Sequence, residues 1–170
     1  MYDKFGQFGS AEEINQKAAE LKAAGDERGL MELAMENGLD QEDAEEYMDG
    51  ATDRFCTTAM AALGKLRVEK EELKLGNILL DWVEELEEAC LKDPKLAAGV
   101  RKEGRGLDGY IARLADEGYS NMTKVDRRIV AQTKKVKQVI GSHEFGIGIP
   151  DKATRARIMK EYYLEGRMIV

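Results

Sequence analysis

The stretch Asn77–Lys92, NILLDWVEELEEACLK, decides the fold. Its apolar residues recur at i, i+1, i+4, i+5, i+8, i+11 and i+12, which is the spacing of one continuous face of an α-helix. These residues are Ile78, Leu79, Trp82, Val83, Leu86, Ala89 and Cys90. Most carboxylates of the stretch fall on the opposite face. The pattern therefore predicts a helix with one side packed in a core and the other side in water.

The segments on either side also have helical spacing between capping signals. Ser10 begins a capping box that predicts a helix over residues 11–24. Glycines and aspartates then delimit two short helices before residue 50, and a longer helix is expected at 52–72. Pro94 follows Asp93 and is expected at the first position of another helix. The chain is therefore predicted to be all-α, a compact bundle of roughly seven or eight short to medium helices.

The C-terminal third is predicted to contain a basic amphipathic helix that begins at Thr123. Its apolar face is expected to comprise Val125, Ile129, Val136, Val139 and Ile140. Residues 141–150 hold three glycines and are expected to form a loop or a short extended stretch. A final helix is expected over residues 151–165.

Composition bounds the class of protein. With 170 residues and 43% apolar side chains, the chain is long enough to bury a real core. No apolar run is long enough for a membrane span, and the N-terminus lacks the apolar region of a secretory signal. Cys56 and Cys90 are expected to be free buried thiols in a reducing compartment. These observations predict a cytoplasmic protein with no membrane partner.

Charge is divided along the chain. Residues 1–100 carry 24 acidic and 11 basic side chains, whereas residues 101–170 carry 9 acidic and 15 basic ones. The expected organisation is an acidic short-helix unit at residues 1–50 and a helical core with basic C-terminal helices at residues 51–170, although both parts can also form one continuous domain. Such a chain can meet two differently charged surfaces, or another copy of itself.

An acidic candidate site follows the turn at Gly38. Residues 33–49 have the layout of a helix-turn-helix, but the second helix contains no Lys or Arg, so it would be repelled by DNA phosphates. Two interpretations remain: a solvated face, or an acidic surface that docks on a basic partner as a DNA mimic would. The candidate partner-binding residues are Asp40, Glu42, Asp43, Glu45, Glu46 and Asp49.

A basic candidate site lies in the C-terminal third. Lys and Arg spaced around helices can contact nucleic-acid phosphates, but they can also be a solvated face or pair with the acidic half. No aromatic platform interleaves these charges, which disfavours stacking of single-stranded bases. The candidate nucleic-acid-binding residues are Lys124, Arg127, Arg128, Lys134, Lys135, Lys137, Arg155 and Arg157.

No catalytic or metal-binding constellation accompanies these surfaces. The single histidine, His143, lies in a glycine-rich stretch with no Cys nearby. The glycines of residues 104–109 follow no strand, so they do not predict a dinucleotide site. The chain is therefore expected not to be an enzyme and to need no cofactor.

Three blocks of sequence carry a resemblance. The chain resembles a group of small acidic proteins of phages and mobile elements of Firmicutes that includes inhibitors of the RNA-guided nuclease of type II CRISPR systems. The blocks are Tyr2-Asp3-Lys4-Phe5-Gly6 with Ser10–Asn15, then Glu36–Asp40 with Glu42–Glu45 and Tyr47–Gly50, and finally Gly148-Ile149-Pro150 with Tyr162-Tyr163-Leu164.

The resemblance implies an anti-CRISPR protein in a bacterial host cell. Such a protein would bind the effector nuclease with its guide RNA and block its engagement or cleavage of DNA. The alternatives are a nucleic-acid-associated accessory protein of a phage or conjugative element, with weak affinity for duplex DNA, and a homodimeric interaction module.

Overall fold

The computed structural model describes residues 4–165 and confirms the all-α class. Within that range it contains ten α-helices, one π-helical turn and one sheet of two very short strands, so the helices are somewhat more numerous than expected. No helix in residues 4–165 has the length and apolar character needed to cross a membrane.

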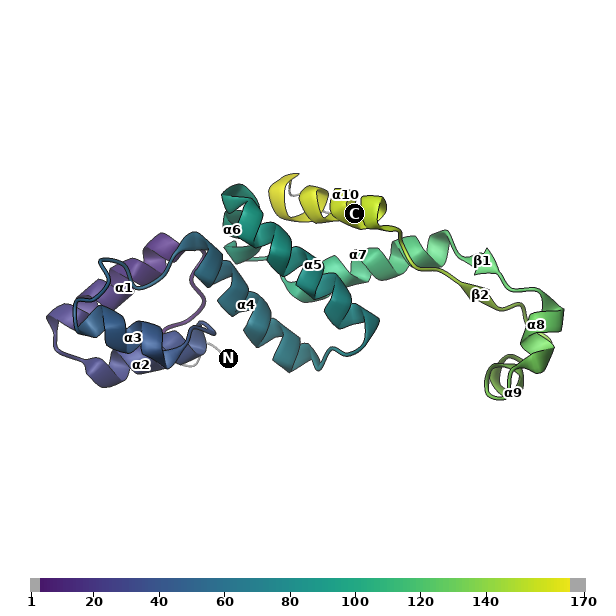
Figure 1. The fold of residues 1–170 in the computed structure, drawn as a ribbon, viewed down its shortest axis with the longest axis horizontal. Helices are drawn as coiled ribbons and strands as arrows, with labels where there is room; N and C mark the ends of the chain where they lie inside the picture. The colour runs from purple at the N-terminus through teal and green to yellow at the C-terminus, as the bar shows by residue number, and fades with distance from the viewer. Residues whose placement is uncertain (1–3, 166–170) are drawn as a thin grey trace.

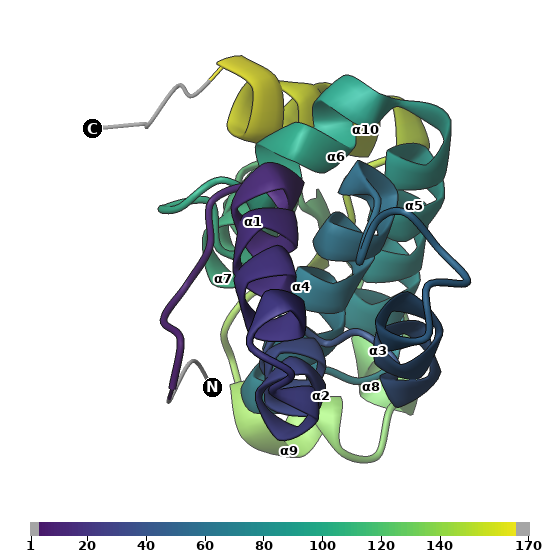
Figure 2. The ribbon, with the colours of Figure 1, turned by 90° about the vertical axis from the view of Figure 1, so that its left-hand side faces the viewer.

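The elements lie in three groups along an elongated molecule (Figure 1). One end holds α1 (Ala11–Ala23), α2 (Glu27–Glu36) and α3 (Gln41–Met48). The middle holds α4 (Thr58–Leu73), α5 (Ile78–Lys92), α6 (Pro94–Arg101), α7 (Leu107–Ser120), α10 (Lys152–Lys160) and the π-helical turn Glu161–Glu165. The other end holds β1 (Thr123–Lys124), α8 (Arg127–Gln132), α9 (Val136–Ile140) and β2 (Gly146–Ile147). Figure 2 looks along the long axis from the end formed by α1–α3.

The N-terminal helices form where the capping signals predict them. The Ser10 hydroxyl accepts a hydrogen bond from the Glu13 amide (3.2 Å), and the Glu13 carboxylate accepts one from the Gly9 amide (2.7 Å). Ile14, Leu33 and other apolar side chains of α1–α3 then bury together in one core cluster. This cluster also takes in Ala61 of α4, so the first helical unit packs directly on the middle of the molecule.

The central core is built on the predicted helix α5. Its inward side buries Trp82, Val83, Leu86 and Cys90 against α4, α6, α7 and α10, as the sequence pattern predicts. The Asp93 carboxylate caps α6 by accepting hydrogen bonds from two backbone amides, and proline occupies the first helical position. Burial of this apolar face supplies the main stabilisation of the middle group.

Helix α4 starts at Thr58 and not at residue 52 as expected. The reason is a long-range contact of the Asn15 side chain. Its Oδ1 accepts hydrogen bonds from the amides of Phe55 (2.9 Å) and Cys56 (3.0 Å), while its Nδ2 donates to the Cys56 carbonyl (2.9 Å). These bonds hold residues 55–56 outside the helix.

Close backbone packing and a buried guanidinium join the first unit to the core. A Cβ atom added at Gly64 in α4 would lie 2.1 Å from the carbonyl oxygen of Asn37, so the α2–α3 turn can approach only a glycine here. Arg101 is fully buried and donates to the carbonyls of Phe8 (2.9 Å) and Ala61 (3.2 Å) and to the Asn37 side chain.

The prediction of a single basic helix from Thr123 to about Ile140 is wrong. Thr123 and Lys124 pair with Ile147 and Gly146 as antiparallel strands, and Asp126 caps a separate helix, α8. Thr133 ends that helix by donating its hydroxyl to the Val130 carbonyl (2.7 Å) and also accepts from the Lys137 amide (3.1 Å). The expected apolar face is consequently not assembled, and neither α8 nor α9 has a buried residue.

Candidate functional site

The acidic candidate residues lie on α3 and at its N-terminal end. The helix turns Ala44 and Tyr47 into the core, which leaves its carboxylates on the outward side. Asp40 pairs with Arg67 of α4, with 2.8 Å between Oδ1 and Nη1. Among residues 4–165, none of the other five carboxylates makes an ion pair. These five, Glu42, Asp43, Glu45, Glu46 and Asp49, are named the acidic face below.

Lys22 contacts α3 through Tyr47 and not through the carboxylates of the acidic face. The Lys22 ammonium lies 4.4 Å from the centroid of the Tyr47 ring and donates to the Tyr47 carbonyl. Beside the acidic face, Asp43 and Glu46 line an open pocket of about 400 Å³ together with residues 52–57 and Met60. Arg54 also lines this pocket, so two cations, Arg54 and Lys22, lie near the acidic face, although neither forms an ion pair with its carboxylates.

Two of the resemblance blocks meet at this end of the molecule. The backbone amides of Lys4 and Phe5 donate to the two carboxylate oxygens of Glu36, at 2.7 and 3.1 Å. The first block thus packs against the second, which also contains α3. Tyr2 and Asp3 of the first block lie outside the described residues. The third block contributes Tyr162 and Tyr163 to the central core.

The basic candidate residues separate into two groups. Six of the eight lie at the opposite end of the molecule from α3 (Figure 1), within residues 123–147, a segment named the basic arm below. All six are exposed, and no residue of the arm is buried. The six are Lys124, Arg127, Arg128, Lys134, Lys135 and Lys137.

Only two acidic residues lie in the basic arm, and both are paired. Lys124 lies 2.7 Å from Glu144, and Arg128 lies 3.0 Å from Asp126. Hydrogen bonds from these cations hold the pKa of each carboxyl below its ordinary value. Both acids are therefore ionised near neutral pH, and six basic side chains against two acidic ones leave the arm with a net charge of +4.

The other two candidates belong to α10 and are held by carboxylates. Arg155 donates from Nε (2.8 Å) and Nη2 (2.6 Å) to the two oxygens of Glu85, and from Nη1 to the Pro150 carbonyl (2.6 Å). Arg157 lies 3.6 Å from Glu117 and 3.1 Å from Glu161. The structure therefore places these two arginines away from the arm, in contacts within the protein.

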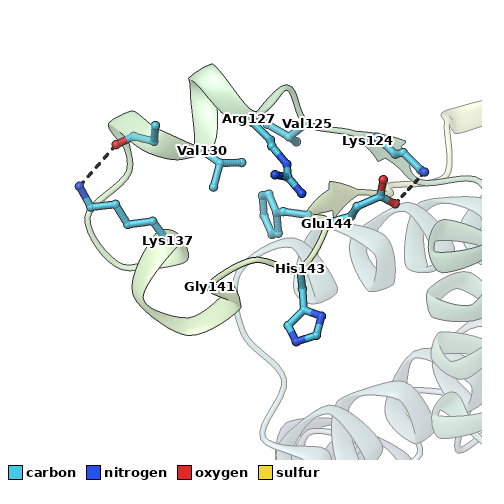
Figure 3. A pocket seen from close by; sticks show the side chains of 10 residues that line it. Lys124, Val125, Arg127, Val130, Lys137, Gly141, His143 and Glu144 are labelled. Atoms are coloured by element: carbon cyan, nitrogen blue, oxygen red, sulfur yellow. Dashed lines mark hydrogen bonds and ion pairs between the residues drawn. The ribbon is translucent and has the colours of Figure 1, made fainter.

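A small pocket lies in the basic arm between its helices and its strands (Figure 3). It has a volume of about 240 Å³, and its apolar lining includes Val125, Val130 and Phe145. Arg127 points into it and His143 lies at its rim (Figure 3). Sequence reasoning missed Phe145 as a functional candidate. The available signal was that it is the only Phe, Tyr or Trp in residues 123–147.

The remaining titratable groups add no reactive cluster. Burial raises the pKa of the free thiols of Cys56 and Cys90 to about 12, which makes them poor nucleophiles. Within the described range 4–165, no group of three or more His, Cys, Asp or Glu residues is arranged to hold a metal ion.

Two surfaces of opposite charge are thus the main chemical features of the described residues. Comparison with known proteins finds no matching family model, no matching curated sequence and no matching solved structure.

Proposed function

We propose that the protein is a non-enzymatic inhibitor of the RNA-guided nuclease of type II CRISPR systems. In this proposal the protein binds the nuclease with its guide RNA and blocks its engagement or cleavage of DNA. The resemblance of three sequence blocks gives the class of partner. The acidic face on α3, whose carboxylates make no ion pair within residues 4–165, is the observation that carries the proposal.

The chemistry of the partner suits an acidic face. Nucleases of this class hold guide RNA and target DNA in a positively charged channel, where a cluster of carboxylates can compete with phosphates. Helix α3 is fixed by the buried Ala44 and Tyr47, so little backbone entropy is lost when its carboxylates are engaged. Opposite charge also accelerates encounter, and salt screens this effect.

The separation of the acidic face from the basic arm also supports docking of the acidic face in a basic channel. The basic arm lies at the far end from α3 (Figure 1). Docking of the acidic face in a basic channel therefore does not bring the arm's net charge of +4 against the same surface. If the arm lay beside the acidic face, repulsion between the arm and the basic channel would offset part of the attraction between the acidic face and the channel.

The proposal is tested with purified nuclease, guide RNA and labelled target DNA. We expect the full chain to co-purify with the nuclease–guide complex and to suppress cleavage at concentrations comparable with that of the nuclease. Normal cleavage together with no binding to the nuclease–guide complex would contradict the proposal.

The basic arm favours a second candidate, a nucleic-acid-associated accessory protein. Free duplex DNA separates the two functions. The overall negative charge opposes tight binding, so the inhibitor proposal expects affinity no better than about micromolar, with a logarithmic salt slope of about −0.9 per phosphate contacted. Nanomolar, sequence-selective binding without inhibition of the nuclease would favour the accessory function instead.

A further inference from the structure

The basic arm lacks a core of its own and exposes both charged and apolar side chains. Its two helices contain six and five residues, too few to be stable in isolation, and nothing in the arm is buried. Large apolar side chains face water, with Ile129 60% and Val139 84% exposed. The arm thus combines positive charge with accessible apolar surface.

The pocket in the basic arm is lined by both apolar and positively charged side chains. Its apolar wall includes Val125, Val130 and the ring of Phe145. Arg127 makes one long hydrogen bond there, from Nη2 to the Ser142 carbonyl at 3.4 Å, so most of its N–H donors are available. After Lys124, the Arg127 charge also helps to lower the pKa of Glu144. Lys137 also lines the pocket, and its ammonium makes a similarly long contact of 3.4 Å with the Ala131 carbonyl (Figure 3).

A nucleotide, which joins a flat aromatic base to a sugar phosphate, matches this lining. Nucleobases stack on aromatic rings in proteins that bind single strands, and a guanidinium binds phosphate oxygens in a forked geometry. A volume of about 240 Å³ is below the usual range of drug-sized pockets, so it suits one unit of a longer ligand. Glu144 also lines the pocket, but its charge is offset by Lys124 at 2.7 Å.

We propose that the arm pocket binds one nucleotide unit of a single strand of nucleic acid. The base lies against Phe145, and Arg127 binds the phosphate. Lys134 and Lys135, which are exposed and make no ion pair within residues 4–165, attract the neighbouring phosphates of the strand. This site is separate from the acidic face and goes beyond the proposed inhibition of a nuclease.

The test uses the full chain without any nuclease, so it stands apart from the test of inhibition. Amide resonances of the ¹⁵N-labelled protein are followed during titration with a short oligothymidylate, with thymidine 5′-monophosphate and with inorganic phosphate. We expect the oligonucleotide to shift amides around Phe145 and Ser142 at the lowest concentrations. The mononucleotide should shift the same amides more weakly, and inorganic phosphate weakest of all.

Neighbouring arginines provide a matched pair of variants. Arg127 lines the pocket, whereas Arg128 does not and is held by Asp126 at 3.0 Å. Arg127→Gln should weaken oligonucleotide binding about tenfold, and Arg128→Gln, with the same change in charge, less than about twofold. Phe145→Leu should also weaken it about tenfold, because an aliphatic side chain cannot stack. The Val125 amide, which donates to the Phe145 carbonyl at 2.8 Å, reports whether the arm remains folded in that variant.

Several outcomes would overturn the proposal. Equal losses in the two arginine variants would show diffuse electrostatic attraction. Inorganic phosphate that binds as tightly as the oligonucleotide would show an anion site with no role for the base. Unchanged amide resonances throughout the oligonucleotide titration would show that the pocket does not bind a strand.

Discussion

At the scale of single residues, Arg101 joins the N-terminal unit to the central core. Its guanidinium is fully buried and donates to the carbonyls of Phe8 and Ala61 and to the side chain of Asn37. These partners belong to the N-terminal segment, to α4 and to the end of α2. A buried charge is tolerated only when its donors are satisfied, so the fold depends on all three contacts being present together.

Arg101→Met should therefore destabilise the protein. The variant leaves the buried Asn37 side chain and two carbonyls without their donor, and we expect a loss of roughly 3 kcal/mol in the free energy of unfolding. Urea unfolding followed by circular dichroism measures it. Lys102→Met, at the exposed neighbouring position, should change stability by less than about 0.5 kcal/mol. Equal stability of the two variants would show that Arg101 does not join the units.

At the scale of elements, an ion pair fixes α10 to α5. Arg155 donates two hydrogen bonds to Glu85, whose side chain is one-third exposed. The hydrogen bonds from Arg155 lower the pKa of Glu85 in the folded protein. A carboxyl with a lowered pKa stabilises the folded state at pH values above its ordinary pKa. This stabilisation is lost as the pH falls through the lowered pKa.

Glu85→Gln should consequently make stability less sensitive to acid. Thermal unfolding at pH 7 and pH 3 should show a smaller drop in Tm for this variant than for the unaltered protein. Glu84→Gln, at the exposed neighbouring position on α5, should show the full drop, because Glu84 makes no ion pair within residues 4–165. A full drop in Glu85→Gln as well would assign the acid sensitivity to other carboxyls.

Some of the helices and strands could be predicted from the sequence, and others could not. Helices α1, α5 and α6 were predictable because their signals are local: the Ser10 capping box, the apolar spacing of α5 and the Asp93-Pro94 start. The division of the basic segment into strand and short helices was not, because β1 pairs with a strand more than 20 residues away. Nor was the position of Arg155, whose partner lies 70 residues away in the sequence.

The candidate surfaces were predictable to different degrees. The carboxylates of α3 lie together because they follow one another on a single short helix, which the sequence states directly. The neighbourhood of Phe145 is not local, since the chain must turn back through α8 and α9 before this ring reaches Val125 and Arg127. The glycines and charged residues around Phe145 predict an irregular segment, but they do not indicate which side chains pack beside the Phe145 ring.

At the scale of the whole molecule, the charge division of the sequence becomes a separation in space. Residues 1–50 carry 14 acidic and 4 basic side chains, and residues 4–50 contribute the end with α3, whereas the basic arm forms the other end (Figure 1). Helices α4–α7 and α10 hold the two ends apart. Under the two proposals made above, one molecule would contact a positively charged protein surface with one end and a nucleic acid with the other.

The most direct test of the central claim compares two triple variants that remove the same charge. Glu42→Gln, Glu45→Gln and Glu46→Gln neutralise the acidic face, and Glu71→Gln, Glu72→Gln and Glu84→Gln neutralise exposed carboxylates of α4 and α5. Gln and Glu have similar helix propensity, so both proteins should fold. Affinity for the nuclease–guide complex is measured at low and at physiological salt. We expect the α3 variant to bind about tenfold more weakly at low salt and with a shallower salt dependence, and the control to bind as the unaltered protein does. Equal affinities of the two variants at low salt would contradict docking through the acidic face.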